Sequence, residues 1–165
     1  MPGLRSLALA LLPALPAAAE STEEDRVASF SDWSVFVAAG GTECWASTYD
    51  RGAGKGRSPV AQLMVTWWPR DGVAGELTVL SLAGAFREGE GMSIDTGAAS
   101  APLYADVDWA WTEGPATDDR IRAGIAAGAR RLVLVETGTG SLAFSTAGAA
   151  EAFADAARRC GMAPS

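Results

Sequence analysis

Histidine is absent from this chain of 165 residues, which contains one lysine and two cysteines. Without histidine, the Ser-His-Asp and Cys-His arrangements that activate nucleophiles are excluded. The sequence also lacks a G-x-S-x-G elbow, a phosphate-binding loop ending in G-K-[ST] and a dinucleotide-binding fingerprint. Two thiols without histidine do not complete a usual zinc shell. We therefore expect no catalytic residues, no metal site and no cofactor.

Positive charge is also scarce. The chain has 13 Lys and Arg against 20 Asp and Glu, a net charge of −7 at pH 7. Basic residues form no cluster, and a negative field repels phosphate backbones and anionic membrane surfaces. We therefore expect no nucleic-acid partner.

Long apolar runs are missing except near the start. Leu7–Leu15 is apolar apart from Pro13, Arg5 precedes it, and small residues follow. This order is typical of a cleavable secretory signal over residues 1–19, cut before Glu20. A membrane-spanning helix needs roughly 20 apolar residues. We expect a periplasmic or secreted protein with no membrane span in its mature form.

Both cysteines, Cys44 and Cys160, lie in the expected mature chain. Exported proteins meet an oxidising compartment, where an even number of cysteines indicates pairing. A bond between them would close a loop of more than 100 residues, which the chain-entropy model associates with about 4–5 kcal/mol. Two free thiols or an intermolecular bridge are the alternatives.

Short β-rich runs dominate the mature chain. Residues 20–29 are polar and are expected to form a flexible leader, and residues 30–162 a single domain. Turns rich in Gly, Pro and Ser separate the runs. The expected strands are 33–37, 43–49, 60–68, 76–82, 92–95, 101–104, 107–112, 132–136 and 141–144. Their number and spacing indicate a mainly β fold, an immunoglobulin-like β-sandwich with two short helices.

Helical periodicity occurs twice. The first helix is expected to begin with Thr117 as its N-cap and to stop at Gly128. The second, over 148–160, is the C-terminal helix, and Phe153 is the one large residue in its apolar stripe. Phe153 should therefore supply most of its docking energy, while Asp155 is expected to face solvent. The stripe consists of Ala149, Phe153, Ala156 and Cys160.

Tryptophan occurs six times. Trp109 and Trp111 alternate with Ala110 in the expected strand 107–112, so both rings are expected in the core.

Three other tryptophans are candidates for a binding surface. Trp67 and Trp68 are adjacent in a strand, so one must enter the core and the other must face outward. An exposed indole can stack against a sugar ring or a partner's side chain. Trp45, Trp67 and Trp68 are therefore the possible binding surface, with ordinary packing as the alternative.

Two pairs of acidic residues are candidates for hydrolysis. Asp106 and Asp108 alternate along one run, and Asp118 and Asp119 lie at a helix start. A glycosidase needs two carboxyl groups across a cleft, one with a raised pKa. Solvent-facing strand positions and the helix dipole explain these residues more simply.

Several motifs together resemble the invasion-associated locus B family of exported bacterial proteins. The resemblance covers nearly the whole mature chain in order. Its motifs are the signal, Asp32–Val37, Thr42–Trp45, Gly75–Leu77 after W-P-R-D-G-V, Trp109–Trp111, the Thr117–Ile121 helix start and Phe144–Ser145 leading to Arg158–Cys160.

The resemblance implies a β-sandwich, a periplasmic or secreted location and a non-enzymatic role tied to host-cell entry or envelope function. This chain departs from the family where Ala149 replaces the usual Phe or Leu, and it lacks a second disulfide. Our hypothesis is a non-catalytic protein that binds another protein or an envelope component. The alternatives are a carbohydrate-binding module that uses an exposed tryptophan and, less favoured, a hydrolase that uses aspartates.

Overall fold

The computed structural model describes residues 26–52, 58–84, 86, 89 and 91–163. The expected signal at 1–19 and residues 20–25 of the expected leader lie outside this range. Residues 26–29 were also assigned to the leader, but they form a strand with Phe30 that pairs with the next one.

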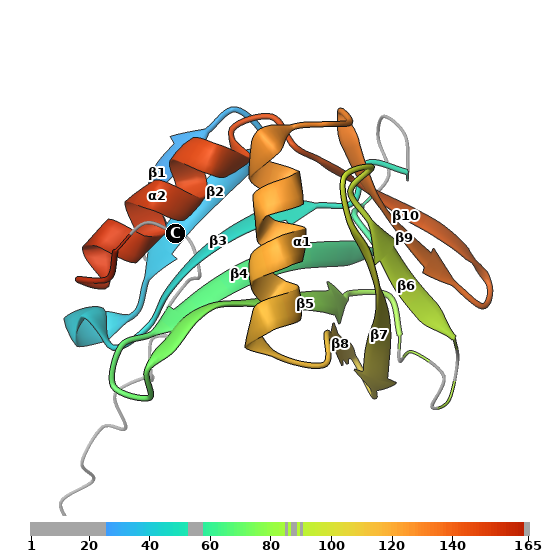
Figure 1. Cartoon of the computed structure of the whole chain (residues 1–165), viewed down its shortest axis with the longest axis horizontal. Helices are drawn as coiled ribbons and strands as arrows, with labels where there is room; N and C mark the ends of the chain where they lie inside the picture. Colours follow the sequence, from blue (N-terminus) through green and yellow to red (C-terminus); the bar gives the residue numbers. More distant parts are fainter. Residues whose placement is uncertain (1–25, 53–57, 85, 87–88, 90, 164–165) are drawn as a thin grey trace, which may run out of the picture.

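The described residues form ten β-strands and two α-helices (Figure 1). The strands are β1 (Arg26–Phe30), β2 (Trp33–Val37), β3 (Cys44–Tyr49), β4 (Ala61–Trp68), β5 (Val73–Ser81), β6 (Met92–Asp95), β7 (Ser100–Asp106), β8 (Trp109–Trp111), β9 (Leu132–Thr137) and β10 (Gly140–Ser145). The helices are α1 (Pro115–Ala127) and α2 (Ala149–Arg159), with a 3₁₀ turn at Ala39–Gly41. A mainly β fold with two helices, one of them C-terminal, is therefore confirmed.

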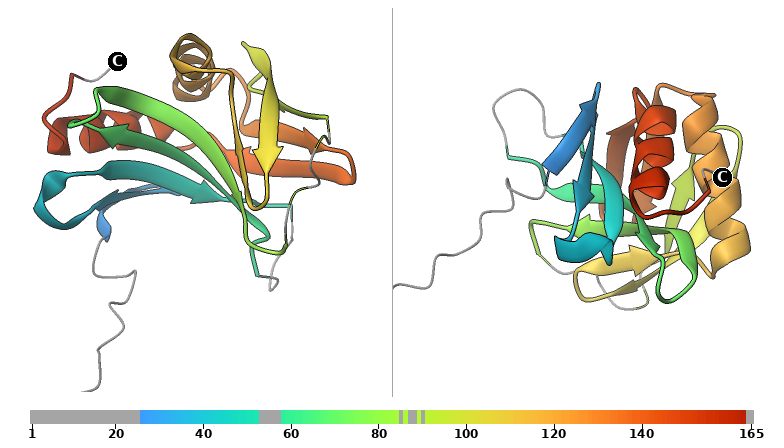
Figure 2. Two further views of the ribbon diagram at one scale, coloured as in Figure 1. Left: turned by 90° about the horizontal axis from the view of Figure 1, so that it is seen from below. Right: turned by 90° about the vertical axis from the view of Figure 1, so that its left-hand side faces the viewer.

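The strands form one antiparallel sheet in the order β1-β2-β3-β4-β5-β8-β7-β6-β9-β10. The sheet curves strongly (Figure 2), and its far end returns towards β3. Asp50, just after β3, forms a bridge with Phe144 of β10, and the Arg51 N–H donates to the Ala143 carbonyl at 2.8 Å. Because the ten described strands belong to one continuous sheet and not to two packed sheets, the expected β-sandwich is not confirmed.

Both helices pack against the same, inner face of the sheet (Figures 1 and 2). Along β4, Leu63, Val65 and Trp67 are buried as predicted. Gln62 and Met64 are half-buried, whereas Thr66 is also buried. The inner-face residues of β2 to β5 meet Ile121 and Ile125 of α1 and Phe153 of α2 in one core.

Helix α1 begins three residues earlier than predicted, with its N-cap at Gly114 in place of Thr117. Pro115 occupies its first turn and Gly114 precedes it as the N-cap, in agreement with the preference of proline for the first helical position. The Thr117 hydroxyl does not cap the helix; it donates to Glu113 at 3.0 Å. The predicted stop is confirmed, since Gly128 adopts the left-handed conformation with φ 61°.

Helix α2 docks through the predicted stripe. Ala149, Phe153, Ala156 and Cys160 are all buried, and the Phe153 ring meets the edge of Trp33 at 4.9 Å between centroids. Gly148 precedes the helix as its N-cap with φ +86°, and a Cβ atom there would lie 1.9 Å from the Phe30 carbonyl oxygen. Glycine is therefore required where α2 approaches β1.

The expectation that Asp155 faces solvent is wrong. Its side chain is 13% exposed, because Arg158 and Arg159 fold back over it with ion pairs of 3.0 and 2.6 Å. Burial raises the pKa of Asp155, but the hydrogen bonds from Arg159 and Arg158 outweigh it and leave that pKa below its ordinary value.

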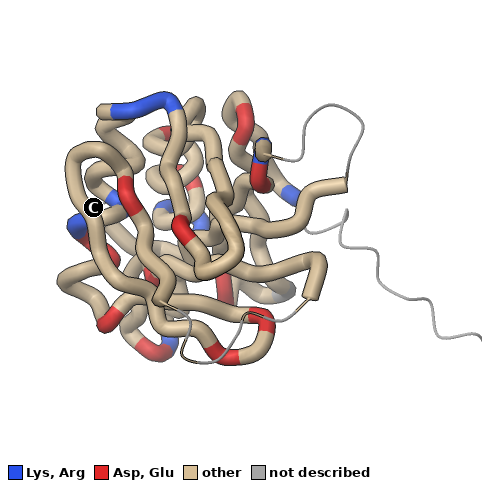
Figure 3. Tube along the Cα trace, turned by 90° about the vertical axis from the view of Figure 1, so that its right-hand side faces the viewer, with Lys and Arg blue, Asp and Glu red and all other residues tan. Residues whose placement is uncertain are grey.

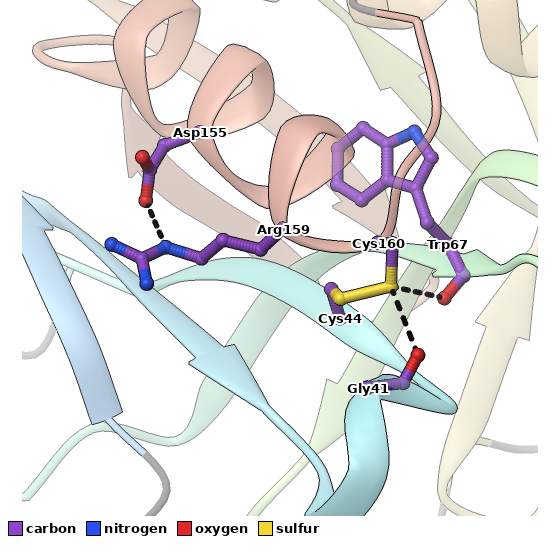
Figure 4. The surroundings of a disulfide bond; sticks show 6 residues. All are labelled: Gly41, Cys44, Trp67, Asp155, Arg159 and Cys160. Atoms are coloured by element: carbon purple, nitrogen blue, oxygen red, sulfur yellow. Dashed lines mark hydrogen bonds and ion pairs between the residues drawn. A yellow bond between two sulfur atoms is a disulfide. The ribbon is translucent and has the colours of Figure 1, made fainter.

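The predicted disulfide between Cys44 and Cys160 is confirmed (Figure 4). The two Cα atoms are 5.8 Å apart, within the usual range. The bond joins the start of β3 to the residue that follows α2, and Cys160 Sγ lies 3.6 Å from the Trp67 carbonyl oxygen. It therefore ties the end of the C-terminal helix to the inner face of the sheet.

Candidate functional site

One of the three tryptophans predicted as a binding surface lies in the core, and two are half-buried. Trp67 is 1% exposed and belongs to the core, so its assignment to a surface is wrong. Trp45 is half-buried, and its ring stacks on Phe36 with centroids 5.2 Å apart and planes 4° from parallel. Trp68 is half-buried on the outer face of the sheet. The prediction that one of the two adjacent tryptophans is core and the other faces outward is confirmed.

The assignment of Trp109 and Trp111 to the core is wrong. They are 42% and 38% exposed, while Ala110 between them is completely buried. Residues 107–112 do not form one strand, because the chain reverses between β7 and β8, and Val107 has φ 51° in this turn. The two indoles therefore point to the outer face of the sheet.

The strand register brings these side chains together. Trp111 of β8 pairs with Thr78 of β5, and Thr78 pairs with Met64 of β4. On the neighbouring row Glu76 pairs with Thr66. Residues paired across antiparallel strands project from the same face, so these side chains form one continuous outer surface.

This surface contains two adjoining hollows, which we call together the outer groove. The tryptophan hollow, of about 290 Å³, is lined by Glu43, Met64, Thr66, Trp68, Glu76, Thr78, Asp106, Trp109 and Trp111. The acidic hollow, of about 660 Å³, is lined by Asp71, Gly72, Val73, Ala74, Glu76, Trp111, Thr112, Glu113, Gly114, Pro115, Asp118 and Asp119. Glu76 and Trp111 line both and therefore join them.

A buried arginine shapes the groove at Glu76. Arg122 of α1 donates from Nη1 to the carbonyl oxygens of Ala74 and Gly75, at 3.1 and 2.7 Å. The ladder between β4 and β5 is irregular here, and Gly75 has φ +83°. A Cβ atom on Gly75 would lie 2.3 Å from Nη1 of Arg122. The bulge therefore requires glycine, and it sets the direction in which the next residue, Glu76, projects.

Asp118 joins α1 to the sheet on the floor of the acidic hollow. The residue is 5% exposed, and its Oδ1 accepts from the Thr112 hydroxyl at 2.7 Å and from the Leu77 N–H at 3.3 Å. Burial raises the pKa of Asp118 above its ordinary value, although these hydrogen bonds and the charge of Arg122 lower it in part. One carboxylate oxygen of Asp118 is thus used for structure.

Glu76 has a different environment. Burial raises its pKa, and the negative charge of Asp118 raises it further. Among the described residues, no hydrogen-bond donor or cation contacts its carboxylate at hydrogen-bonding distance. The folded protein therefore disfavours the ionised form of Glu76, and no described residue compensates for this cost.

Replacing Glu76 by glutamine should raise the urea midpoint of unfolding at neutral pH. Because the pKa of Glu76 is raised on folding, the native state binds more protons than the unfolded state between the ordinary and the raised pKa. Wild-type stability should therefore increase as the pH falls through this window, towards about pH 4. Glu76→Gln should show a smaller increase than wild type.

The measurement is urea unfolding of both proteins at several pH values from 7 to about 4.5. This range lies above the ordinary pKa of a glutamate side chain, where a raised pKa changes stability. Glu151→Gln, on the exposed side of α2, is the matched control and should follow wild type. A lower midpoint for Glu76→Gln at neutral pH would contradict the environment described for this carboxylate.

Among the described residues, no group of three or more His, Cys, Asp and Glu side chains is arranged to hold a metal ion. In the same part of the chain, no helix is long and apolar enough to cross a membrane. A scan against protein-family models and searches among curated proteins and solved structures found no match to this chain.

The outer groove could not be recognised from the sequence pattern. Trp68, Asp106 and Asp118 were singled out separately, whereas Glu76 and the outward direction of Trp109 and Trp111 were missed. One signal was available, since Asp106 and Asp108 on either side of Val107 are typical of a turn. A turn at that point would have separated β8 from β7.

Proposed function

We propose that this chain is an exported, non-catalytic binding protein that resembles the invasion-associated locus B family. In this proposal it holds a protein or an envelope component in the periplasm or outside the cell, and the outer groove is the binding surface. The observation that carries the proposal is the exposure of Trp109 and Trp111 beside Trp68 in one hollow. Large aromatic side chains grouped on an uncovered sheet face are typical of interaction sites.

A binding role is favoured over hydrolysis by the way the acids are used. The acidic hollow contains Glu76 and Asp118, both with raised pKa values, as an acid–base pair would need. However, Asp118 accepts hydrogen bonds from the Leu77 N–H of β5 and from the Thr112 hydroxyl. These bonds fix α1 on the sheet. That role explains Asp118 without catalysis.

Carbohydrate binding is the second candidate, because indole rings beside carboxylates suit a sugar that stacks and donates hydrogen bonds. A row of coplanar rings would favour it. Among the described side chains, aromatic rings contact each other between Phe36 and Trp45 and between Phe153 and both Trp33 and Trp67. No such contact joins two of the groove tryptophans. Separate rings are better suited to receive separate side chains of a protein partner.

The test compares the immobilised mature protein with a Trp109→Ser/Trp111→Ser double variant in a capture experiment from periplasmic extract. We expect a partner retained by wild type to be lost from the double variant, with unchanged far-UV circular dichroism because both side chains lie outside the core. Tyr49→Ser is the matched control, since Tyr49 is 49% exposed but lines neither hollow.

Identical capture by wild type and the double variant would refute the groove as the binding surface. Affinity electrophoresis in gels containing cell-wall polysaccharide tests the sugar candidate in parallel. Retardation that depends on Trp109 and Trp111, without protein capture, would favour the carbohydrate-binding alternative.

A further inference from the structure

The outer groove has an unusual balance of charge. Seven carboxylates line its two hollows, whereas no lysine or arginine among the residues that the structure describes lines either. Of these seven, Asp119 has an ion pair within the described residues, with Arg122 at 2.7 Å. Figure 3 shows that acidic residues predominate along the lower part of the molecule in that view. The seven are Glu43, Asp71, Glu76, Asp106, Glu113, Asp118 and Asp119.

Tryptophan side chains line the same two hollows as these carboxylates. Trp111 lines both hollows, and Trp68 and Trp109 line the smaller one together with Glu76. A cation over an indole face is attracted by the ring quadrupole, and a neighbouring carboxylate adds charge pairing. A bound cation would also relieve the unfavourable state of the Glu76 carboxylate, which is partly buried near Asp118. The groove is therefore complementary to positive charge on an apolar stem.

The size of the groove favours a chain of residues over a single small cation. The hollows measure about 660 and 290 Å³ and adjoin at Glu76 and Trp111, so they offer more than one position for a side chain. Arginine suits these positions better than lysine, because its planar guanidinium stacks on aromatic rings and pairs with carboxylates in a bidentate manner.

We propose that the outer groove binds an extended, arginine-containing segment of a partner protein, with guanidinium groups seated on Trp109 and Trp111 beside Glu76. This inference rests on the proposed function, because it names the chemistry of the partner for the same surface. It commits to a basic peptide and not to a sugar, a metal ion or a second copy of this chain.

Isothermal titration calorimetry of the mature protein with an oligoarginine peptide tests the proposal. The salt concentration is about 150 mM, at which long-range attraction between exposed charges is screened. Oligocitrulline of equal length is the matched neutral probe and should bind at least tenfold more weakly. Trp111→Ala and Glu76→Gln should each weaken oligoarginine binding about fivefold or more, the range of a partly desolvated cation–π contact or charge pair. Tyr49→Ala and Glu151→Gln, both outside the groove, should change it less than about twofold.

Equal binding of oligocitrulline would overturn the proposal, because positive charge would not be recognised. Equal losses from Glu76→Gln and Glu151→Gln would overturn it as well, since the attraction would then be diffuse. If oligoarginine does not bind while capture dependent on Trp109 and Trp111 succeeds, this inference fails and the proposed function stands. If both experiments fail, both are refuted. Sedimentation showing dimers that Trp111→Ala abolishes would assign the groove to a second copy and overturn the inference.

Discussion

Phe153→Ala is expected to lower the free energy of unfolding by about 3–5 kcal/mol, the usual cost for a buried phenylalanine. Phe153 is 4% exposed, and its ring lies 4.9 Å from that of Trp33 and 6.3 Å from that of Trp67. The other buried residues of α2 are alanines and bury little area. Removing this ring therefore leaves a cavity that small neighbours on α2 cannot fill.

The measurement is urea unfolding with the disulfide intact. Phe153→Leu keeps most of the volume and should cost less than about 1.5 kcal/mol. Glu151→Gln, on the exposed side of the same helix, should cost less than about 0.5 kcal/mol. Asp155 does not serve as a neutral control, because its carboxylate pairs with Arg158 and Arg159. A Phe153→Ala protein as stable as Glu151→Gln would mean that α2 does not dock through this ring.

Strands with strict alternation could be predicted closely. The run ending at Trp68 alternates large apolar residues with Gln62, Met64 and Thr66, and β4 lies within one residue of its expected start. The prediction that Trp109 and Trp111 lie in the core was wrong because the pattern Trp109-Ala110-Trp111 is compatible with either face of the strand being buried. Their size predicts that both tryptophans are in the core, but the short β8 presents its smallest side chain, Ala110, to the inside. Local pattern alone does not decide this case.

The order of strands and the candidate site depend on contacts far apart in the chain. The bulge at Gly75 is fixed by Arg122, which is 47 residues away. Asp118 reads as a first-turn acid of a helix, yet it hydrogen-bonds to Leu77, 41 residues earlier. Neither contact follows from spacing or composition, so the position of Glu76 could not be predicted. The disulfide could be predicted, since two cysteines leave only one intramolecular pairing.

The double variant Cys44→Ala/Cys160→Ala should lower the free energy of unfolding by about 4–5 kcal/mol in the chain-entropy model. The two cysteines are 116 residues apart, so the crosslink removes much of the freedom of the unfolded chain. Replacing both residues avoids a lone buried thiol, and alanine fits positions that are 0% and 7% exposed. Urea unfolding gives the change in stability.

The effect should also be local, because the bond holds the C-terminal end of α2 against β3 and β4. Hydrogen exchange of α2 amides should accelerate more in the double variant than that of β4 and β5, where the sheet is paired on both sides. Wild type reduced with dithiothreitol should reproduce both changes, and oxidised wild type neither. An unchanged unfolding midpoint in the double variant would mean that the unfolded chain is already compact around this pair. A uniform acceleration over the whole sheet would mean that α2 and the sheet unfold as one unit, with Phe153 sufficient to hold the helix until then.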